Sequence, residues 1–413
     1  MLVVGSHVRL QGLRAKPELN GKEGVCVGCQ EALGRWKVIV DGGAEFAFKA
    51  ENLEVITPKF EVFLDSCSMQ GLRNTQEDRH VKVANFTKAA KALKMPIDHL
   101  SQPCAFAAVY DGHCGQACSD FAAKGFHMKL LKKLSADTNP SSWTADRIEG
   151  ALRATCEELD AEFLAKYRTA KDGTTVVAAL VVGEQCFVTW AGDSRGIAGR
   201  EGPGGTCVAM ALTQDHRPTS ESEAQRIVAD GGEVVVLDDA CVRVAQKGYQ
   251  DRVLEIIRAE QQGLGMIGKP PVAMAVSRSL GDRDFKAVTR GSNIITATPE
   301  VHVLSLDASI KFVALMSDGI TDAMTNEEMV ALLERHGSEG NDACKSLVQE
   351  ALARGSSDNV TAVLARFAWS RTSMDSSVGP AQKRARTDAK FCNICRGRTD
   401  ERGECAECGV ISA

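Results

Sequence analysis

The sequence lacks an apolar run that approaches the roughly 20 residues needed to span a bilayer. The start, Met1 to Val4, is too short for the apolar part of a secretory signal, and Leu2 stands where N-myristoylation requires glycine. We therefore expect a soluble chain with no membrane partner. The cytoplasm and the nucleus stay equally open as its location.

A basic excess is also missing, since the net charge of the chain is -5 at pH 7. Proteins that bind nucleic acids usually carry a strong basic excess, so the acidic balance argues against nucleic acid as the main partner. The fifteen cysteines come without a secretory signal and indicate a reducing compartment, where cysteines are mostly buried thiols or metal ligands. No cysteine sits in a recognisable phosphate-binding loop, which argues against a thiol nucleophile.

Three short acidic motifs, far apart in the chain, are its most informative feature. In each, an Asp stands at the end of an apolar, strand-like run or in the turn beside one, from which its carboxylate can reach a shared site. A single Asp-Gly pair is ordinary turn chemistry. Carboxylate and carbonyl oxygens together suit Mg²⁺ or Mn²⁺, so the three turns predict a site for hard divalent ions. The motifs are Tyr110-Asp111-Gly112-His113, Ser317-Asp318-Gly319 and Ser357-Asp358-Asn359.

Further motifs accompany these turns and, in this order along the chain, resemble those of the PP2C (PPM) family of metal-dependent protein serine/threonine phosphatases. The resemblance covers about residues 60 to 368. It rests on Met69-Gln70-Gly71-Leu72-Arg73-Asn74-Thr75-Gln76-Glu77-Asp78, Asp172-Gly173-Thr174-Thr175, Gly192-Asp193-Ser194-Arg195-Gly196, Ala275-Val276-Ser277-Arg278-Ser279-Leu280-Gly281-Asp282 and Asp318-Gly319-Ile320-Thr321-Asp322.

The patterns in this region predict an α+β fold, because strand-like runs occur in groups and helical stretches stand apart. The resemblance implies an α-β-β-α sandwich of two antiparallel sheets flanked by helices, with the metals in a cleft at one sheet end. We expect hairpin-connected strands of one sheet at 174–182, 185–191 and 206–211, further strands at 60–67, 105–109, 313–316 and 360–367, and helices at 115–134, 144–167, 326–335 and 341–354. A capping box at Ser220-Glu221-Ser222-Glu223 predicts another helix, which ends at Gly231-Gly232.

The resemblance also implies the metal ligands. Asp111 would touch two metals and the Gly112 carbonyl would complete one coordination sphere. The resemblance further assigns ligands to the other metal, Asp318 and Asp358, and residues that act through coordinated water, Glu77 and Asp78. A water or hydroxide bound at this dinuclear Mg²⁺ or Mn²⁺ site would attack the phosphorus of phosphoserine or phosphothreonine directly.

Two further residues carry catalytic expectations. Arg73 would clamp the phosphate, because its planar guanidinium can donate two parallel hydrogen bonds and stays charged. His113 resembles the family's general acid, which protonates the departing alkoxide. The alternative for His113 is a histidine that only orients Asp111.

Asp193 and Asp322 suggest a third metal position beside Asp318. The alternative for Asp193 is a tight hairpin turn with an internal ion pair to Arg195. We expect the pair Thr174-Thr175 to pack or form hydrogen bonds beneath the site. The segment from Ser277 to Asp284 would border a flap, and an insertion-like stretch between Val244 and Ala273 contains an amphipathic helix at residues 251–258 that either lengthens this flap or is a tolerated surface insertion.

A chain of 413 residues is long for one core, and its ends differ in texture from the centre. Residues 1–57 show short alternating runs between turns and resemble an SH3-like barrel, which would dock partners or only pack against the region at 60–368. We expect Cys26 and Cys29 to be two strand or turn thiols, since a lone C-x-x-C is weak support for zinc.

After Phe367, Ser, Thr, Gly, Pro and basic residues predict a flexible linker at 369–390. Its basic cluster at residues 383–386 reads either as a nuclear localisation signal or as a solvated charge run. Residues 391–413 carry two C-x-x-C pairs, whose spacing resembles a zinc knuckle, and we expect a structural Zn²⁺ there because so short a segment cannot build an apolar core. The expected ligands are Cys392, Cys395, Cys405 and Cys408.

The hypothesis is a monomeric, metal-dependent hydrolase of phosphoproteins in signalling, with possible docking partners for the barrel and the zinc tail. One alternative is an inactive PP2C-like scaffold that only binds phosphoproteins. The intact set of acidic residues and Arg73 argues against it. A second alternative is a nucleic-acid-binding protein built around the zinc tail, which the overall acidity makes at most a secondary activity.

Overall fold

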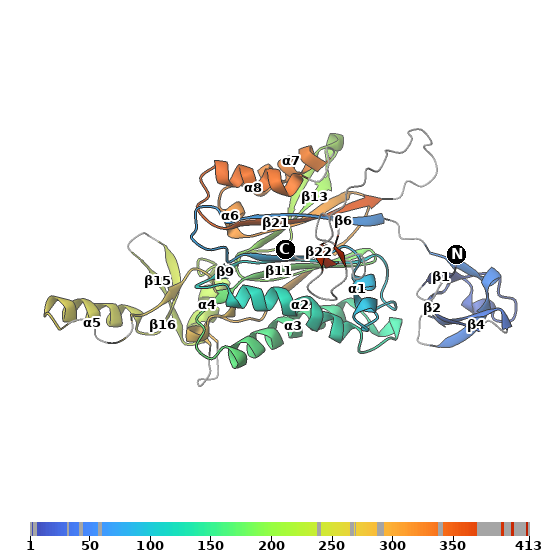
Figure 1. The fold of residues 1–413 in the computed structure, drawn as a ribbon, viewed down its shortest axis with the longest axis horizontal. Helices are drawn as coiled ribbons and strands as arrows, with labels where there is room; N and C mark the ends of the chain where they lie inside the picture. The colour runs from blue at the N-terminus through green and yellow to red at the C-terminus, as the bar shows by residue number, and fades with distance from the viewer. Residues whose placement is uncertain are drawn as a thin grey trace.

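Four layers make up the main body of the protein: two antiparallel sheets lie face to face, with helices on each outer side (Figure 1). The computed structural model describes residues 2, 6–30, 33–40, 44–56, 60–237, 241–264, 268, 270–286, 293–337 and 342–369, and the backbone of 390–391, 398–399 and 410–411. No described helix is long and apolar enough to cross a membrane. The predicted α+β sandwich is confirmed.

The first sheet has five strands, and both chain ends of the main body lie in it as neighbours. Its order is β14 (Cys207–Ala211), β13 (Arg195–Glu201), β20 (Ile310–Met316), β21 (Val360–Trp369) and β6 (Phe60–Met69). The second sheet has six strands in the order β19 (Glu300–Ser305), β12 (Gln185–Ala191), β11 (Val176–Val182), β8 (Cys104–Tyr110), β7 (Arg79–Val83) and β24 (Val410–Ile411).

The strand at 206–211 was predicted to belong to the same sheet as 174–182 and 185–191, and this was wrong. The run at 206–211 forms β14, but β14 pairs with β13 in the five-stranded sheet, whereas β11 and β12 form a hairpin in the other sheet. The physical reason is that the chain leaves one sheet after Ala191 and enters the other at Arg195. Period-2 alternation marks a strand but does not choose its sheet. The strands β7, β13 and β19 and the helix α1 (Phe86–Ala92) were not predicted.

Strand β8 shows how alternation builds two cores from one segment. Its side chains are all buried, but alternate ones point to opposite faces of the sheet. Phe106, Ala108 and Tyr110 face the helices, while Ala105, Ala107 and Val109 face the other sheet. A strand buried on both faces has to be apolar throughout, and this explains the run Cys104–Tyr110.

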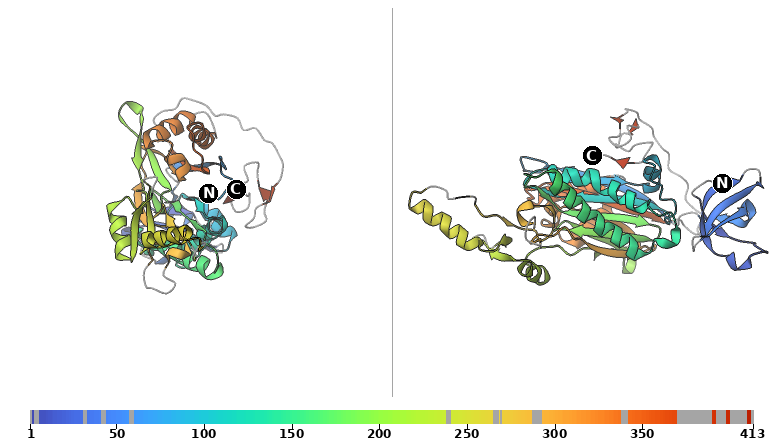
Figure 2. Two further views of the ribbon diagram at one scale, coloured as in Figure 1. Left: turned by 90° about the vertical axis from the view of Figure 1, so that its left-hand side faces the viewer. Right: turned by 90° about the horizontal axis from the view of Figure 1, so that it is seen from below.

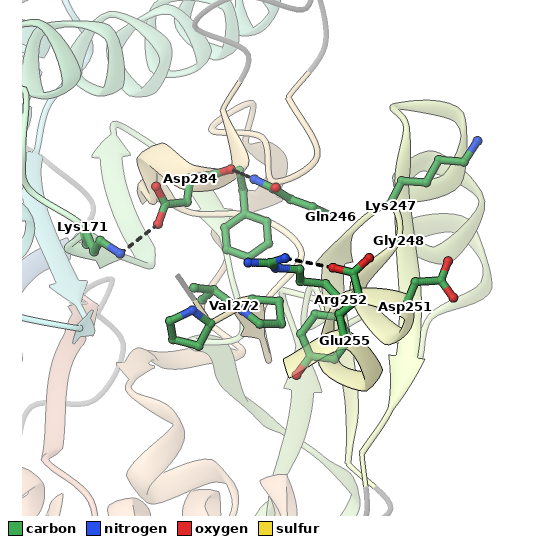
Figure 3. Close-up of a pocket in the computed structure, with 13 residues that line it drawn as sticks. Lys171, Gln246, Lys247, Gly248, Asp251, Arg252, Glu255, Val272 and Asp284 are labelled. Atoms are coloured by element: carbon green, nitrogen blue, oxygen red, sulfur yellow. Dashed lines mark hydrogen bonds and ion pairs between the residues drawn. The ribbon is translucent and has the colours of Figure 1, made fainter. Parts of the chain in front are cut away.

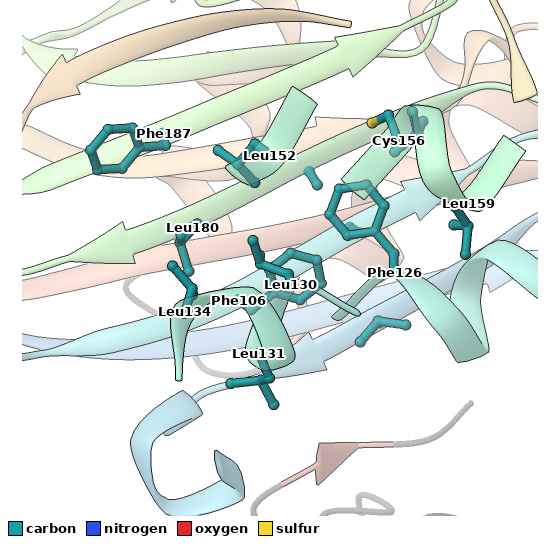
Figure 4. Packing of buried hydrophobic residues seen from close by; sticks show 14 of the residues in the cluster. Phe106, Phe126, Leu130, Leu131, Leu134, Leu152, Cys156, Leu159, Leu180 and Phe187 are labelled. Atoms are coloured by element: carbon teal, nitrogen blue, oxygen red, sulfur yellow. The ribbon is translucent and has the colours of Figure 1, made fainter. Parts of the chain in front are cut away.

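Two long helices, α2 (Ala117–Leu134) and α3 (Ala145–Lys166), cover the outer face of the six-stranded sheet (Figures 1 and 2). Figure 4 shows leucine and phenylalanine side chains of both helices against β8, β11 and β12. The rings of Phe106 and Phe126 lie 5.8 Å apart, centre to centre. Burying each such side chain contributes about 1.5–3 kcal/mol.

On the other outer side, α7 (Asn326–Gly337) and α8 (Ala343–Ala353) cover the five-stranded sheet, and a short α6 (Asp318–Thr321) follows β20. Helix α4 (Glu221–Ala229) forms where the capping box predicted it. The predicted capping hydrogen bonds were wrong, because the Ser220 side chain makes no hydrogen bond to the first turn of α4. Glu223 instead accepts hydrogen bonds from Arg226 and Arg278, which outcompete the backbone N–H for this carboxylate.

The predicted insertion forms a projecting flap. Within it, α5 (Tyr249–Gln261) confirms the expected amphipathic helix. The three-stranded sheet beside α5, which lies mostly outside the predicted bounds, consists of β15 (Gly232–Val236), β16 (Val242–Gln246) and β17 (Ala273–Met274). Figure 1 shows α5 extending from one end of the sandwich, opposite the end that carries the N-terminal sheet.

The N-terminal region folds as a separate five-stranded antiparallel sheet in the order β4 (Glu45–Lys49), β3 (Arg35–Val40), β2 (Glu23–Gln30), β1 (His7–Leu10) and β5 (Leu53–Val55). Within the described residues, β4 and β5 are edge strands that do not pair with each other, so the sheet is not closed into a barrel. Cys26 and Cys29 both lie in β2 as free thiols, as expected.

The C-terminal predictions fall almost wholly on residues outside those described. The linker, its basic cluster and the four expected zinc ligands lie there. Three short strands of this region are described by their backbone alone. β22 (Lys390–Phe391) pairs with β23 (Arg398–Thr399), and β24 pairs with β7 of the main body.

Candidate active site

A small three-stranded sheet joins three distant segments at one end of the sandwich. It consists of β9 (Gly112–His113), β10 (Gly173–Thr174) and β18 (Leu280–Gly281). Gly173 is paired with His113 on one side and with Gly281 on the other. A Cβ atom on Gly173 would come within 2.2 Å of the His113 Nε2 atom, so only glycine allows this close approach. The small sheet therefore brings two of the predicted motifs to the acidic turn after β8.

Asp111 lies directly after β8 and is fixed through its backbone. The Thr175 N–H donates to the Asp111 carbonyl at 2.8 Å, and the Thr174 hydroxyl donates to the same oxygen at 3.0 Å. The Asp111 N–H donates to the Thr175 hydroxyl oxygen at 3.3 Å. The predicted role of the two threonines beneath the site is thereby confirmed.

Four carboxylates interact at this point. Burial, followed by the negative charges of Asp318, Asp78 and Asp193, raises the pKa of Asp111 well above its usual range. Burial and the charge of Asp318 raise the pKa of Asp193 to about 7. Burial and the charges of Asp358 and others also raise the pKa of Asp318. Like charges brought together in this way require a nearby cation or a bound proton.

Asp78 is held from the five-stranded sheet. The Ser317 hydroxyl donates to its Oδ2 atom at 2.9 Å, while its buried Oδ1 atom has no hydrogen-bond partner among the described residues. Burial, opposed by hydrogen bonds and assisted by the charge of Asp318, raises the pKa of Asp78 to about 6. A buried acceptor without a partner is costly, so this atom is suited to a ligand that comes from outside the chain.

Gly112 and Glu77 are packed against each other. A Cβ atom on Gly112 would meet the Glu77 carbonyl oxygen at 2.5 Å and the Ser119 hydroxyl at 2.8 Å. The requirement for glycine here is thus one of space. The Glu77 N–H donates to the Asn359 side chain at 2.8 Å, and Asn359 also donates to the carbonyls of Gln70 and Thr75.

The donor set fits hard divalent cations, because it consists of buried oxygen atoms with mutual repulsion and one unsatisfied acceptor. No group of three or more His, Cys, Asp or Glu side chains in the described part of the chain is already arranged to hold a metal ion. Arginines engage several of the acids instead. Arg73 contacts Asp358 at 2.6 Å, and Arg217 contacts Asp193 at 3.3 Å and Asp322 at 2.8 Å. Each of these carboxylates keeps lone pairs that the guanidinium does not use, so it can accept from the arginine and bind a cation at the same time.

Arg73 lies at the edge of the site, with 59% of its side chain exposed. Its single ion pair with Asp358 leaves the remaining donors of the guanidinium accessible to an incoming anion. The role of Arg73 as a phosphate clamp stays a prediction.

His113 faces Asp282 and not Asp111. Its Nε2 atom lies 2.9 Å and 2.8 Å from the two carboxylate oxygens of Asp282. The predicted alternative, in which His113 orients Asp111, has no support in these contacts. Burial lowers the pKa of His113, but the Asp282 charge and hydrogen bond outweigh it, so the pKa is raised above its ordinary value.

The predicted alternative for Asp193 was wrong. Arg195 donates to Asp215 at 2.7 Å and 3.0 Å, because its side chain extends across the hairpin toward the loop after β14. The cation beside Asp193 is Arg217. Burial lowers the pKa of Arg217, but the charges of Asp193 and its neighbours raise it overall.

A pocket lies between the flap and the small sheet (Figure 3). It has a volume of about 520 Å³ and is lined by side chains of both signs around Tyr249 and Phe285. Lys171 contacts Asp284 at 3.3 Å and Arg252 contacts Glu255 at 2.8 Å. Lys171 precedes β10 by two residues and Asp284 follows β18 closely, so the pocket borders the small sheet, and none of the described residues that were predicted to bind Mg²⁺ or Mn²⁺ lines it.

Three site residues were missed from the sequence: Asp282, Arg217 and Asn359. Asp282 and Asn359 stand inside motifs that carry the resemblance, so their presence was visible but their contacts were not. Arg217 lies in Asp215-His216-Arg217-Pro218, after β14, and had no pattern that linked it to Asp193 or Asp322.

Comparison with known proteins agrees with the geometry. A sequence profile described as Protein phosphatase 2C matches residues 63–360. Probable protein phosphatase 2C 45 of Oryza sativa subsp. japonica is 32% identical over 262 residues, which cover 63% of this chain and 75% of that protein. Probable protein phosphatase 2C 2 of Arabidopsis thaliana is 30% identical over 302 residues, which cover 71% of this chain and 64% of that protein.

Several relatives are longer than the matched stretch. The chain spans 65% of Probable protein phosphatase 2C 59 of Oryza sativa subsp. japonica, at 31% identity over 264 residues and 63% of this chain. The crystal structure of serine-threonine phosphatase 2C from Toxoplasma gondii shares the fold, with a TM-score of 0.59 and 23% sequence identity over 76% of this chain and 96% of that chain. The matched profile spans most of the chain and includes all three acidic turns up to Val360. The chain belongs to the protein phosphatase 2C family.

Proposed function

We propose that this protein is a metal-dependent phosphatase that hydrolyses phosphoserine and phosphothreonine in phosphoproteins. The observation that carries the proposal is the convergence of Asp78, Asp111, Asp193 and Asp318, whose charges raise one another's pKa values at one end of the sandwich. Such a group is costly to bury unless cations compensate it. The family membership gives the cations and the substrate class.

Two Mg²⁺ or Mn²⁺ ions, held by Asp111, Gly112, Asp318 and Asp358 and through water by Glu77 and Asp78, would neutralise phosphoryl charge and lower the pKa of bound water. Asp193 and Asp322 form the proposed third position, which Arg217 now contacts. Arg73 binds the phosphoryl oxygens with its remaining donors. Asn359 holds Glu77 close to Asp358, because its side chain forms hydrogen bonds with the segment from Gln70 to Glu77.

His113 gives its proton to the serine or threonine oxygen as the bond between that oxygen and phosphorus breaks. The seryl or threonyl alkoxide is a poor leaving group, so a positioned acid accelerates this step by roughly 10²–10⁴-fold. Water provides the new oxygen on phosphorus and loses a proton to solvent, so the products are the alcohol and inorganic phosphate.

The test is hydrolysis of a phosphothreonine peptide by metal-stripped protein, with Mn²⁺ or Mg²⁺ added back. We expect turnover to return with metal and to be abolished in Asp111→Asn and Asp318→Asn. Folded, metal-loaded wild-type protein without turnover, but with retained binding of the phosphopeptide, would favour the inactive scaffold instead.

For the flap we propose a role in substrate recognition. The support is the pocket between the flap and the small sheet that carries His113, a pocket whose lining includes the exposed cation Lys247. Lys247→Glu should raise KM for phosphopeptides with acidic flanking residues a few-fold and leave KM for basic ones unchanged or lower. An equal KM change for both peptides would contradict recognition by charge.

The proposed domain division is 1–57, 60–368, 369–390 and 391–413. The N-terminal unit, which we propose to be SH3-like, contacts the main body through His7, whose Nε2 atom lies 3.0 Å from the Asp98 carbonyl oxygen. This contact supports packing against the phosphatase domain, and pull-down with residues 1–57 deleted would reveal an additional docking role. The zinc proposal for the tail rests on the spacing of its cysteines, and metal analysis of the four Cys→Ser variants tests it.

A further inference from the structure

Asp282 is the one side chain that the structure gives His113 as a hydrogen-bond partner among the described residues. Both of its carboxylate oxygens lie within 2.9 Å of the His113 Nε2 atom. Asp282 is 169 positions away in the sequence and reaches the histidine because β18 and β9 both pair with β10. The Asp282 side chain is buried, with 2% exposed, whereas 22% of the His113 side chain is exposed. The pair thus consists of a buried carboxylate and a partly exposed imidazole ring.

The Asp282 backbone is held in an unusual conformation. Its φ is 48°, in the left-handed region that residues with a Cβ rarely adopt. Such a conformation persists where the surroundings impose it, and it often marks a functional residue. The surroundings here are the Asp282 N–H, which donates to the Asp172 carbonyl at 3.1 Å, and the Ser279 hydroxyl, which donates to the Asp282 carboxylate.

A second buried ion pair, between Lys286 and Asp160, holds the chain on either side of Asp282. The Gly281 N–H donates to Asp160 at 2.7 Å, and Lys286 donates to Asp160 at 3.3 Å and to the Ser279 carbonyl at 2.8 Å. All of these contacts are buried, and through Asp160 they attach Gly281 and Lys286 to α3. The backbone that carries Asp282 is therefore held in place, while the Ser279 hydroxyl and His113 hold its carboxylate.

Gly173 closes the remaining space around the pair. A Cβ atom there would lie 2.2 Å from His113 Nε2 and 2.3 Å from Asp282 Oδ2. No other side chain can insert between the two groups. The Nε2 atom of His113 is thereby committed to Asp282, and Nδ1 is the ring nitrogen left to exchange a proton with a substrate.

We propose that Asp282 is a positioning residue for the phosphatase reaction. It accepts the Nε2–H bond of His113, fixes the ring, and so presents Nδ1–H to the departing alkoxide oxygen. The proton passes from Nδ1 to that oxygen as the oxygen–phosphorus bond breaks, and the ring keeps its Nε2–H bond to Asp282. The inference rests on the proposed function, because it requires His113 to act as the acid.

The test uses the dependence of rate on the leaving group. A nitrophenolate leaves without a proton, whereas phenolate and the threonine alkoxide need one. We expect Asp282→Asn to lower kcat about 10–100-fold on phenyl phosphate and a phosphothreonine peptide, but less than about 3-fold on p-nitrophenyl phosphate. His113→Ala should show the same selective loss, and the double variant should be no worse than His113→Ala alone.

Equal losses on all three substrates, or additive losses in the double variant, would overturn the inference. If wild-type protein hydrolyses none of the substrates, the proposed function fails and not this inference alone. The matched control is Asp146→Asn on the exposed first turn of α3, which should behave as wild type.

Should Asp282→Asn fail to fold, Ser279→Ala removes only the hydroxyl that donates to Asp282 and should give a weaker loss with the same leaving-group selectivity. Nitrogen chemical shifts of His113 give a readout without turnover. Wild-type protein should show a proton on Nε2 in the neutral ring, and Ser279→Ala should increase the share of the Nδ1–H tautomer. Unchanged shifts together with non-selective kinetics would leave Asp282 with a structural role only and so contradict the proposal.

Discussion

Strand β8 connects two regions of opposite character, the apolar core beneath α2 and α3 and the acidic site at the sheet end. In the core, Phe106 and Ala108 pack against helix side chains (Figure 4). A few residues later, Asp111 is surrounded by other buried carboxylates. Both regions are buried, yet burial stabilises the apolar core, whereas it leaves the carboxylates of the site in need of a compensating positive charge. The same burial that stabilises an apolar side chain penalises each charged one.

The largest expected effect comes from removing the central charge of the site. Asp111→Asn should lower phosphatase turnover by roughly 10³-fold or more, since a divalent ion contributes several kcal/mol to stabilising the reacting phosphoryl group. The same variant should raise the unfolding temperature of metal-stripped protein, because it removes one of four repelling carboxylates. Calorimetry with and without Mn²⁺ checks this, and a lower metal-free unfolding temperature would contradict the comparison.

A substitution in the apolar core should lower the stability of the protein without lowering its turnover. Leu130→Ala lies in α2, fully buried against β8, and should cost about 2–5 kcal/mol of unfolding free energy. Turnover per folded molecule should stay close to wild type, because Leu130 contacts no part of the site. Urea unfolding and active-site titration measure the two quantities. A loss of turnover in fully folded variant protein would show that core and site are coupled.

A buried histidine makes the stability of the apolar core depend on pH. His127 is buried beside the Phe106 ring, and burial lowers its pKa from 6.5 to about 4. Because the unfolded chain binds this proton more readily, stability is fully present above about pH 6.5 and falls as the pH drops toward about 4, by at most about 3 kcal/mol.

His127→Leu should flatten this dependence of the unfolding free energy between pH 4 and 6.5, measured by urea unfolding. Its matched control is His302→Leu, since His302 points to the exposed side of β19 and should leave the slope unchanged. A wild-type slope in His127→Leu would mean that other groups produce the acid sensitivity.

The smallest expected effect concerns the internal cation of the site. Arg217→Ala leaves Asp193 and Asp322 without their shared guanidinium. We expect the metal-free variant to be less stable by about 1–3 kcal/mol and to gain more stability from Mn²⁺ than wild type. Arg217→Lys keeps the positive charge, so its metal-free stability and its stabilisation by Mn²⁺ should lie between those of wild type and Arg217→Ala. Equal Mn²⁺ dependence of the unfolding temperature in all three proteins would show that Arg217 and metal do not compete.

Sequence patterns located most of the regular elements and the acidic turns. The helices α2, α3, α5, α7 and α8 were predicted within a few residues, because each has a periodic apolar face or an amphipathic pattern. Short, mixed-polarity strands such as β7 and β19 were missed. Their identity depends on the neighbouring strands, which cover them in the fold.

Long-range contacts were the other gap. That Arg195 binds Asp215 and not Asp193, and that β14 joins β13 in the five-stranded sheet, depends on how the chain crosses between the two sheets. No local pattern contains this information. The unclosed N-terminal sheet is a similar case, because the alternating runs predicted the strands but not the absence of a β4–β5 pair among the described residues.

The sequence by itself determined which side chains are available for chemistry: carboxylates in three acidic turns, an arginine shortly before a pair of acids, and a histidine two residues after the central aspartate. Side-chain chemistry and local alternation are properties of the chain, so they can be read without a fold. The tertiary structure alone decided that Asp282 faces His113 and that Arg217 lies between Asp193 and Asp322. Such pairs form because strands and loops far apart in the sequence meet at one sheet end, and burial there makes each charge depend on its neighbour.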